Sequence, residues 1–143
     1  MSANDPIRDL DSLQINAELV DLETIRHYIE QRAALFQLNP SITYDIQLAV
    51  TEIVTNSLVH GYPERRGWIE VQIDRLGQKI YVWIRDRAPE FDPTQHLAPD
   101  LSKPLNKRHL GGLGIHLTRQ ITQKISHRNL PEGGNETTLV FGT

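Results

Sequence analysis

The sequence predicts an α+β fold, a two-layer α/β sandwich in which helices cover one face of a mixed, mostly antiparallel sheet. Two observations carry this prediction. The chain contains two pairs of β-rich segments, each joined by a short turn, which is typical of β-hairpins. It also contains apolar residues at helical spacing before and between these pairs. A doubly wound parallel sheet would instead need a helix between successive strands, which the hairpins contradict.

The first half of the chain predicts one strand and two helices. Residues 13–20 alternate between apolar and polar, as a half-buried strand does. Asp21 can cap a helix that ends near residues 39–40, and Ser41 can cap a second helix that ends at residue 58 or 59. The apolar positions expected to be buried on these helices are Leu22, Ile25, Ile29, Ala33 and Leu35, then Ile42, Ile46, Ala49, Val50 and Ile53.

The second half of the chain predicts two hairpins with a loop and a helix between them. The first hairpin pairs residues 68–74 with 79–85, and the last strands are 124–128 and 137–141. Four prolines and no sustained periodicity mark residues 88–109 as a loop. A loop of that length in a compact domain is uncommon unless it is functional, for example as a lid. The helix after the loop has its apolar positions at Ile115, Leu117, Ile121 and Ile125.

Composition and charge limit the class of protein. We expect one domain over residues 1–143, with residues 1–12 as an N-terminal extension. Cysteine is absent, which excludes disulfides, a thiolate nucleophile and cysteine-ligated metal centres. The net charge is -3 and the basic residues are scattered, so we expect neither a nucleic acid nor a membrane as partner. With no long apolar run and an acidic start, the protein is expected to be cytoplasmic.

Three polar residues on the second predicted helix form the first candidate site. Glu52, Asn56 and His60 are spaced four residues apart, so they share one helix face. A glutamate can accept a proton or position a water, and an amide oxygen suits a hard cation such as Mg2+. On spacing alone, an ordinary solvated helix face explains the pattern as well, and His60 alone could simply be a helix-end residue.

A glycine cluster at a predicted helix start forms the second candidate site. It consists of Gly111, Gly112 and Gly114, with Leu113 among them. Such glycines let the backbone approach an anion, and the free N–H groups of a first helical turn favour phosphate. A hinge or a tight helix–sheet contact is the alternative. The cluster is not a Walker loop, because no GK[ST] follows it, and it lacks the surroundings of a dinucleotide-binding fingerprint.

Asp86, at the end of the predicted strand 79–85, is the third candidate. A carboxylate fixed at a strand end above an apolar pocket can accept a hydrogen bond from an exocyclic amine such as that of adenine. The alternative is an aspartate that only initiates the proline-rich loop.

The order of these features resembles a known ATP-binding fold. A helix with E-x-x-x-N-x-x-x-H, a hairpin that ends in aspartate, a long loop and G-G-x-G occur in that order in the fold of gyrase, histidine kinases and MutL, called the GHKL or Bergerat fold. Within it, the chain is most similar to the anti-sigma factor serine/threonine-protein kinases of the RsbW and SpoIIAB type. The resemblance covers residues 13–141, and the segments that carry it are 45–51, 52–62 (EIVTNSLVHGY), 91–93 and 111–115.

The resemblance implies roles for the candidate residues. Glu52 would be catalytic, as the general base or the residue that positions a water. Asn56 would hold Mg2+ against the triphosphate of ATP, with His60 also near the nucleotide. Asp86 would accept a hydrogen bond from the adenine amine, and Thr137 would lie near the same ring.

The resemblance also implies a lid and a phosphate cradle. Residues 88–110 would form the ATP lid, and Gly112 and Gly114 would cradle the phosphates. The cofactor-binding residues expected from this part of the chain are Ala88, Gly111, Gly112, Leu113 and Gly114.

The function implied by the resemblance is regulation of transcription by a transferase. An ATP-dependent kinase would phosphorylate a serine or threonine of a STAS-domain anti-sigma factor antagonist, bind a sigma factor or similar regulator, and form a homodimer. One departure supports an alternative of the same fold, a partner-binding module with weak or no nucleotide binding. The family usually has D-x-G-x-G, whereas Ala88 and Glu90 occupy the two glycine positions of this chain.

Overall fold

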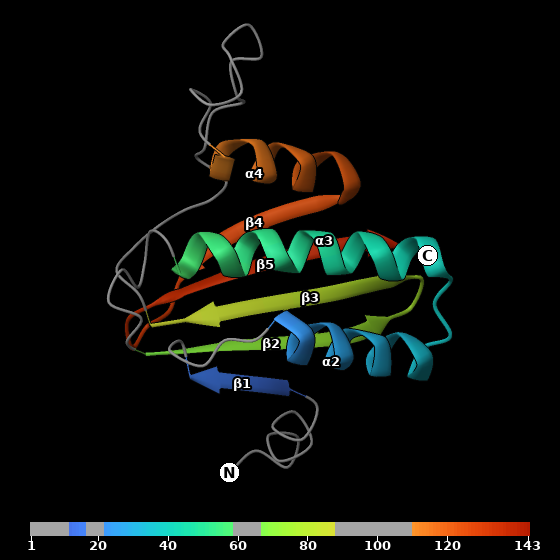
Figure 1. The fold of residues 1–143 in the computed structure, drawn as a ribbon, viewed down its shortest axis with the longest axis horizontal. Helices are drawn as coiled ribbons and strands as arrows, with labels where there is room; N and C mark the ends of the chain where they lie inside the picture. Colours follow the sequence, from blue (N-terminus) through green and yellow to red (C-terminus); the bar gives the residue numbers. More distant parts are fainter. Residues whose placement is uncertain (1–11, 17–21, 59–66, 88–109) are drawn as a thin grey trace, which may run out of the picture.

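The computed structural model describes residues 12–16, 22–58, 67–87 and 110–143, with side chains in the last range from residue 116 onward. Five strands and three helices follow one another in these ranges (Figure 1). The elements are β1 (Ser12–Asn16), α2 (Leu22–Leu35), α3 (Pro40–Asn56), β2 (Trp68–Leu76), β3 (Lys79–Asp86), α4 (Leu110–Ile121), β4 (Lys124–Asn129) and β5 (Asn135–Gly142).

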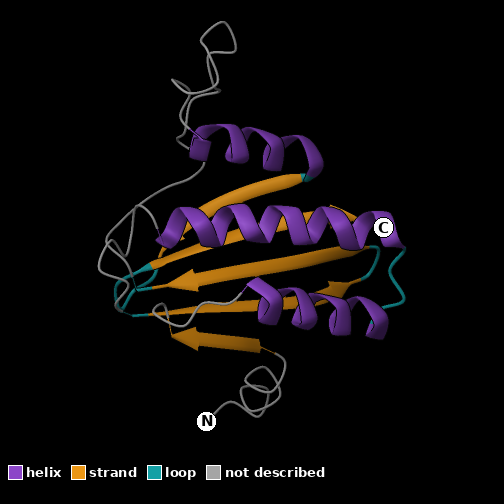
Figure 2. Ribbon diagram, in the orientation of Figure 1, coloured by secondary structure: helices purple, strands orange, loops and turns teal. Residues whose placement is uncertain are grey.

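The strands form a single sheet in the order β1-β2-β3-β5-β4, and the helices cover one face of it (Figure 2). This arrangement confirms the predicted α+β sandwich. All four strand pairings are antiparallel, so the described strands lack the parallel pairing that a mixed sheet would contain. Strand β5 lies between β3 and β4 because the chain passes through α4 to the edge strand β4 before it turns back.

Alternate residues of the central strands face the helices and form the core. Ile69, Val71 and Ile73 of β2 are each 1% exposed, as expected for alternate residues of a strand whose one face is covered by helices. They pack with residues of α2 and α3 and of the neighbouring strands, namely Ile25, Ile29, Ile46, Ala49, Val50, Ile53, Val54, Ile80, Val82, Ile84, Leu139 and Phe141. Burial of this continuous apolar surface is the main stabilising contribution to the fold.

Two expectations for the first two helices are wrong. Leu22 and Leu35 are exposed, because they lie at the two ends of α2, beyond the part of the helix that covers the sheet. The cap of α3 is Asn39 rather than Ser41, because Asn39 has an extended backbone and its side chain accepts a hydrogen bond from the Ile42 N–H at 2.9 Å. Proline at the first helical position suits this arrangement, since its fixed φ is helical and it has no N–H to satisfy.

The described ends of other elements also differ from the prediction. The first strand begins at Ser12, which was assigned to the extension, and its described part ends at Asn16. Helix α4 begins at Leu110, the last residue of the expected lid, so the glycine cluster lies inside the helix rather than before it. Ile125 belongs to β4, because α4 already ends at Ile121.

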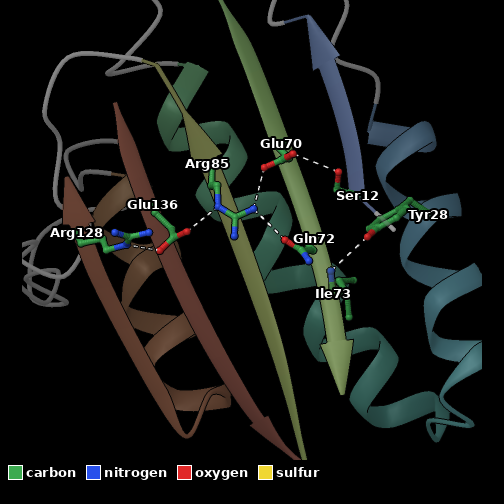
Figure 3. Close-up of polar contacts among 8 residues, drawn as sticks. All are labelled: Ser12, Tyr28, Glu70, Gln72, Ile73, Arg85, Arg128 and Glu136. Carbon is green, nitrogen blue, oxygen red and sulfur yellow. Dashed lines mark hydrogen bonds and ion pairs between the residues drawn. The ribbon is translucent and has the colours of Figure 1, made fainter. Parts of the chain in front are cut away.

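Helix α2 covers the edge of β2 at Ile73, next to the residue that pairs with Ser12 at the start of β1. The Ile73 N–H donates a hydrogen bond to the Tyr28 hydroxyl at 3.2 Å (Figure 3). The Arg32 guanidinium donates to the Ile73 carbonyl oxygen at 3.2 Å. Unpaired backbone groups of an edge strand invite association with other chains, and these two side chains satisfy them. No helix in the described ranges is long and apolar enough to span a membrane.

The face of the sheet opposite the helices, called the outer face below, carries a chain of ion pairs. Arg85 of β3 donates to Glu136 of β5 at 2.6 Å, and to Glu70 and Gln72 of β2 at 2.8 and 3.0 Å (Figure 3). Arg128 of β4 donates to the other oxygen of Glu136 at 2.6 Å. Burial by itself would raise the pKa of Glu136, but the hydrogen bonds from Arg128 and Arg85 outweigh it and hold the pKa below its ordinary value.

Candidate functional site

The C-terminal end of α3, the last residue of β3 and the first residue of β5 meet at one end of the sheet, the left in Figure 1. We call this region the site end. Its central residue is Asp86, which is 5% exposed and pairs in register with Asn135. Ser57 donates from its hydroxyl to Asp86 Oδ2 at 2.8 Å, and Asn135 donates from Nδ2 to Asp86 Oδ1 at 2.9 Å. Because a buried carboxylate is costly without donors, these two contacts explain how Asp86 is held inside the protein.

A glycine allows the β4–β5 turn to close against Asp86. Gly134 has φ +102, which residues with a side chain rarely adopt. A Cβ at this position would overlap the Asp86 carbonyl oxygen and lie 2.9 Å from the Cα of Arg87. The close approach brings Asn135, the next residue, opposite Asp86. Asp86 is therefore a paired, buried residue of the sheet rather than an exposed residue that only initiates a loop.

Glu52 and Asn56 lie one turn apart on the last part of α3. Asn56 is 3% exposed, and its Nδ2 donates to the Glu52 carbonyl oxygen at 2.8 Å. Its Oδ1 accepts no hydrogen bond from the described part of the chain. Glu52 is partly buried, and among the described residues its carboxylate has no hydrogen-bond or ion-pair partner. Burial raises the pKa of Glu52 above its ordinary value, so the proton-bound form is favoured more than in water.

The burial of Asn56 excludes an ordinary solvated position for this residue of α3. A buried amide oxygen without a donor loses its hydration and gains no protein partner in return. Such an oxygen is a suitable ligand for a hard cation, so Asn56 fits the expected Mg2+ contact. Within the described ranges, no three side chains of His, Cys, Asp or Glu gather closely enough to hold a metal ion.

The remaining predicted residues divide into two groups. Thr137 is 4% exposed on β5 and faces the helices, as Asn135 does, so it lies on the same side of the sheet as Asp86. Gly111, Gly112, Leu113 and Gly114 form the start of α4, and this helix packs against α3. The first N–H groups of a helix have no partner within it, which keeps an anion contact open there. His60, Ala88, Glu90 and the expected lid up to residue 109 lie outside the described residues.

Sequence reasoning missed two residues of the site end, Ser57 and Asn135. The sequence favours a turn at Asn135 because this residue follows two glycines. A usable signal existed, since counting back by twos from the apolar Phe141 and Leu139 assigns Thr137 and Asn135 to the same sheet face. Ser57 directly follows Asn56, but nothing in its local sequence indicates contact with Asp86, a residue far along the chain.

Comparisons with known proteins agree with this architecture. The serine/threonine-protein kinase BtrW of Bordetella bronchiseptica is 23% identical over 130 residues, which are 90% of this chain and 91% of BtrW. An anti-sigma F factor of Thermoanaerobacter sp. is 26% identical over 100 residues, 68% of this chain and 70% of that protein. The serine-protein kinase RsbW of Staphylococcus aureus is 30% identical over 88 residues, 57% of this chain and 55% of RsbW.

A solved structure shares the fold at lower sequence identity. The crystal structure of the RsbU and RsbW domains of Rv1364c from Mycobacterium tuberculosis superposes with a TM-score of 0.61 at 19% identity, over 92% of this chain and 31% of that chain. The sequence model of the histidine kinase-like ATPase domain matches residues 15–141, which is nearly the whole chain. The protein therefore belongs to the histidine kinase-like ATPase domain family, and its distant homologues include the RsbW, BtrW and anti-sigma F factor proteins.

Proposed function

We propose that this protein is an ATP-dependent serine/threonine-protein kinase that regulates a sigma factor. It phosphorylates a STAS-domain anti-sigma factor antagonist, binds a sigma factor or comparable regulator, and pairs with a second copy of itself. The observation that carries the proposal is the site end, where Glu52 and the Asn56 amide oxygen lack partners within the described ranges. The names of the relatives, which are protein kinases and anti-sigma factors, support the same assignment.

In this proposal the site end binds the two ends of ATP with different groups. The Asp86 carboxylate accepts a hydrogen bond from the exocyclic amine of adenine, and Thr137 lies on the same face of the sheet. Asn56 presents its Oδ1 to Mg2+, and the N–H groups of residues 111–114 at the start of α4 receive the phosphates. Bound Mg2+ would offset the negative charge of the triphosphate.

Glu52 is the residue proposed to accept the proton of the substrate hydroxyl. As that proton passes to the Glu52 carboxylate, the hydroxyl oxygen bonds to the γ-phosphorus. The bond between the γ-phosphorus and the bridging oxygen breaks, and ADP leaves with the electron pair. The raised pKa of Glu52 supports this role, because a carboxylate that binds a proton more readily is a better base.

Phosphate transfer from radiolabelled ATP to candidate STAS-domain proteins tests the proposal. Glu52→Ala should abolish transfer while ATP binding stays within about twofold, because Glu52 acts on the substrate hydroxyl and not on the nucleotide. Glu30→Ala, an exposed glutamate of α2, is the matched control and should transfer at the wild-type rate. Transfer at the wild-type rate in Glu52→Ala would contradict the assignment.

The second candidate is a partner-binding module that does not use nucleotide. It is favoured by Ala88 and Glu90 at the positions where the family usually has glycine. Binding of ATP at micromolar concentrations supports the kinase. Binding of a sigma factor or antagonist by a protein that ignores millimolar ATP supports the module.

A further inference from the structure

Hydrogen bonds link His127 of β4 and Asn135 of β5 to Asp86 at the end of β3. Asn135 at the start of β5 lies between His127 of β4 and Asp86 of β3. The His127 Nε2 is 3.0 Å from Asn135 Oδ1, and Asn135 Nδ2 is 2.9 Å from Asp86 Oδ1. Asn135 is 4% exposed, so its amide cannot rely on water to replace either contact.

The direction of these hydrogen bonds follows from the chemistry of the carboxylate. An ionised carboxylate only accepts hydrogen bonds, so Asn135 must turn its NH2 group toward Asp86. Its carbonyl oxygen then faces His127, and that oxygen can only accept. In this arrangement His127 donates from Nε2 to the Asn135 carbonyl oxygen.

The same contacts fix the orientation of the Asp86 carboxylate. Ser57 holds Oδ2 from α3 while Asn135 holds Oδ1 from β5. Held on both oxygens, the carboxylate cannot rotate away from a ligand, and it presents only acceptors. A nucleobase with an amine next to the Asp86 carboxylate gains a hydrogen bond. A nucleobase with a carbonyl oxygen there is repelled, because that oxygen and the carboxylate are both acceptors.

We infer that His127 and Asn135 are positioning residues that make the site end selective for a nucleobase with an exocyclic amine. Neither residue touches the base in this scheme, because both act through Asp86. The inference rests on the proposed nucleotide site and names the residues that set its base selectivity. Without the His127 N–H, the buried Asn135 carbonyl oxygen loses this donor, so the amide that holds Asp86 Oδ1 is positioned less firmly.

Two nucleotides that differ at one position provide the test. Inosine triphosphate carries an oxygen where ATP carries the exocyclic amine. The dissociation constants of both are measured by calorimetry for the wild type, His127→Leu, His127→Gln and Asn135→Ala. Lys124→Ala is the matched control, because Lys124 lies on the same strand but on the outer face. The unfolding midpoint of each variant is measured in parallel.

The wild type should bind ATP at least about tenfold more tightly than inosine triphosphate. His127→Leu and Asn135→Ala should reduce this ratio about fivefold, mainly through weaker ATP binding, as expected for loss of one hydrogen bond. His127→Gln, which keeps an N–H donor, should restore most of the ratio. A variant that is merely less stable would lose both nucleotides alike, so the ratio separates positioning from folding.

Two results would overturn the inference in different ways. A wild type that prefers ATP, combined with an unchanged ratio in His127→Leu and Asn135→Ala, would reject the positioning role and leave the proposed function intact. A wild type that binds neither nucleotide would reject the proposed function and the inference together.

Discussion

On the outer face of the sheet, Arg85 lies between Glu70 and Glu136, and every one of these charges has an opposite charge within 2.8 Å. At the site end, Asp86 has its donors, but Glu52 and the Asn56 amide oxygen have none within the described ranges. Both clusters lie on the same sheet, the second together with the end of α3, and both contain buried residues. The difference is that each charge of the outer-face cluster has an oppositely charged partner, whereas Glu52 and the Asn56 amide oxygen have no partner within the described ranges.

The comparison separates residues that stabilise the fold from residues that are kept for a ligand. Opposite charges that are buried together compensate for much of each other's desolvation cost. Removing one of them leaves the others buried without that partner. Unmatched buried polar groups destabilise the fold until something binds them. Changes on the outer face should therefore lower stability and spare ATP binding, whereas changes at Glu52 and Asn56 should alter phosphate transfer or Mg2+-dependent binding, with small or even favourable effects on stability.

The largest expected loss of stability is at Arg85. Arg85→Met keeps most of the side-chain volume but leaves Gln72 without its Arg85 donor, Glu70 with only the Ser12 hydroxyl, and Glu136 with only Arg128. The free energy of unfolding in urea should fall by about 4 kcal/mol, with ATP affinity of the folded protein unchanged. Arg26→Met, which removes an exposed pair with Glu23, is the control and should have little effect. Equal losses of unfolding free energy in Arg85→Met and Arg26→Met would show that the outer-face cluster stabilises the fold no more than an exposed ion pair does.

The next largest effect tests the turn between β4 and β5, which closes against Asp86. Gly134→Ala should destabilise the protein by roughly 3 kcal/mol, because the positive φ and the overlap with the Asp86 backbone both oppose a side chain. Gly133→Ala has a positive φ but no atom within 4 Å of the added Cβ, so it should lose only about 1 kcal/mol. Thermal unfolding of the two variants measures the difference. If they lose equally, the close approach to Asp86 contributes nothing.

The acid side of the stability profile should depend on Glu136. Its pKa is lowered in the folded protein, so its stabilising contribution is complete above its ordinary value of 4.5 and is lost as the pH falls through the lowered value. Glu136→Gln should therefore lower the free energy of unfolding by about 2 kcal/mol at pH 7 and by much less at pH 3. Urea unfolding at the two pH values checks this, and a constant difference would contradict it.

Glu52 should give the smallest effect and the opposite sign. Its pKa is raised in the folded protein, so the fold is favoured below the ordinary value of 4.5 and loses that advantage as the pH rises through the raised value. Glu52→Gln should stabilise the protein at pH 7 by less than about 1 kcal/mol, with a smaller gain at pH 3. The same urea series measures it, and destabilisation at pH 7 would show that the carboxylate is matched after all.

Local sequence patterns were sufficient for the elements and for part of the site end. β-rich segments joined by short turns predicted both hairpins, and the four-residue spacing of Glu52 and Asn56 placed them on one helix face. The pattern could not show that Asn56 is buried, because burial of a helix end depends on what packs over it.

Contacts between segments that are distant in the sequence could not be predicted from local patterns. The pairing of Arg85 with Glu136 depends on β5 lying beside β3, which follows from the strand order and not from either strand alone. The contacts of Asp86 with Ser57 and Asn135 depend on the same order and on the close approach that Gly134 permits. The observed strand ends differ from the predicted ones by a residue or more, because hydrogen-bond pairing and not composition decides where a strand stops.

The claim that the unmatched groups of the site end are kept for a nucleotide is tested most directly by calorimetric titration with ATP. The titration is run with and without Mg2+ on the wild type and on Asn56→Ala. The wild type should bind ATP at micromolar concentrations, with tighter binding when Mg2+ is present. In Asn56→Ala the tightening by Mg2+ should disappear. No binding to the wild type at millimolar ATP, or the same dependence on Mg2+ in both proteins, would contradict the account.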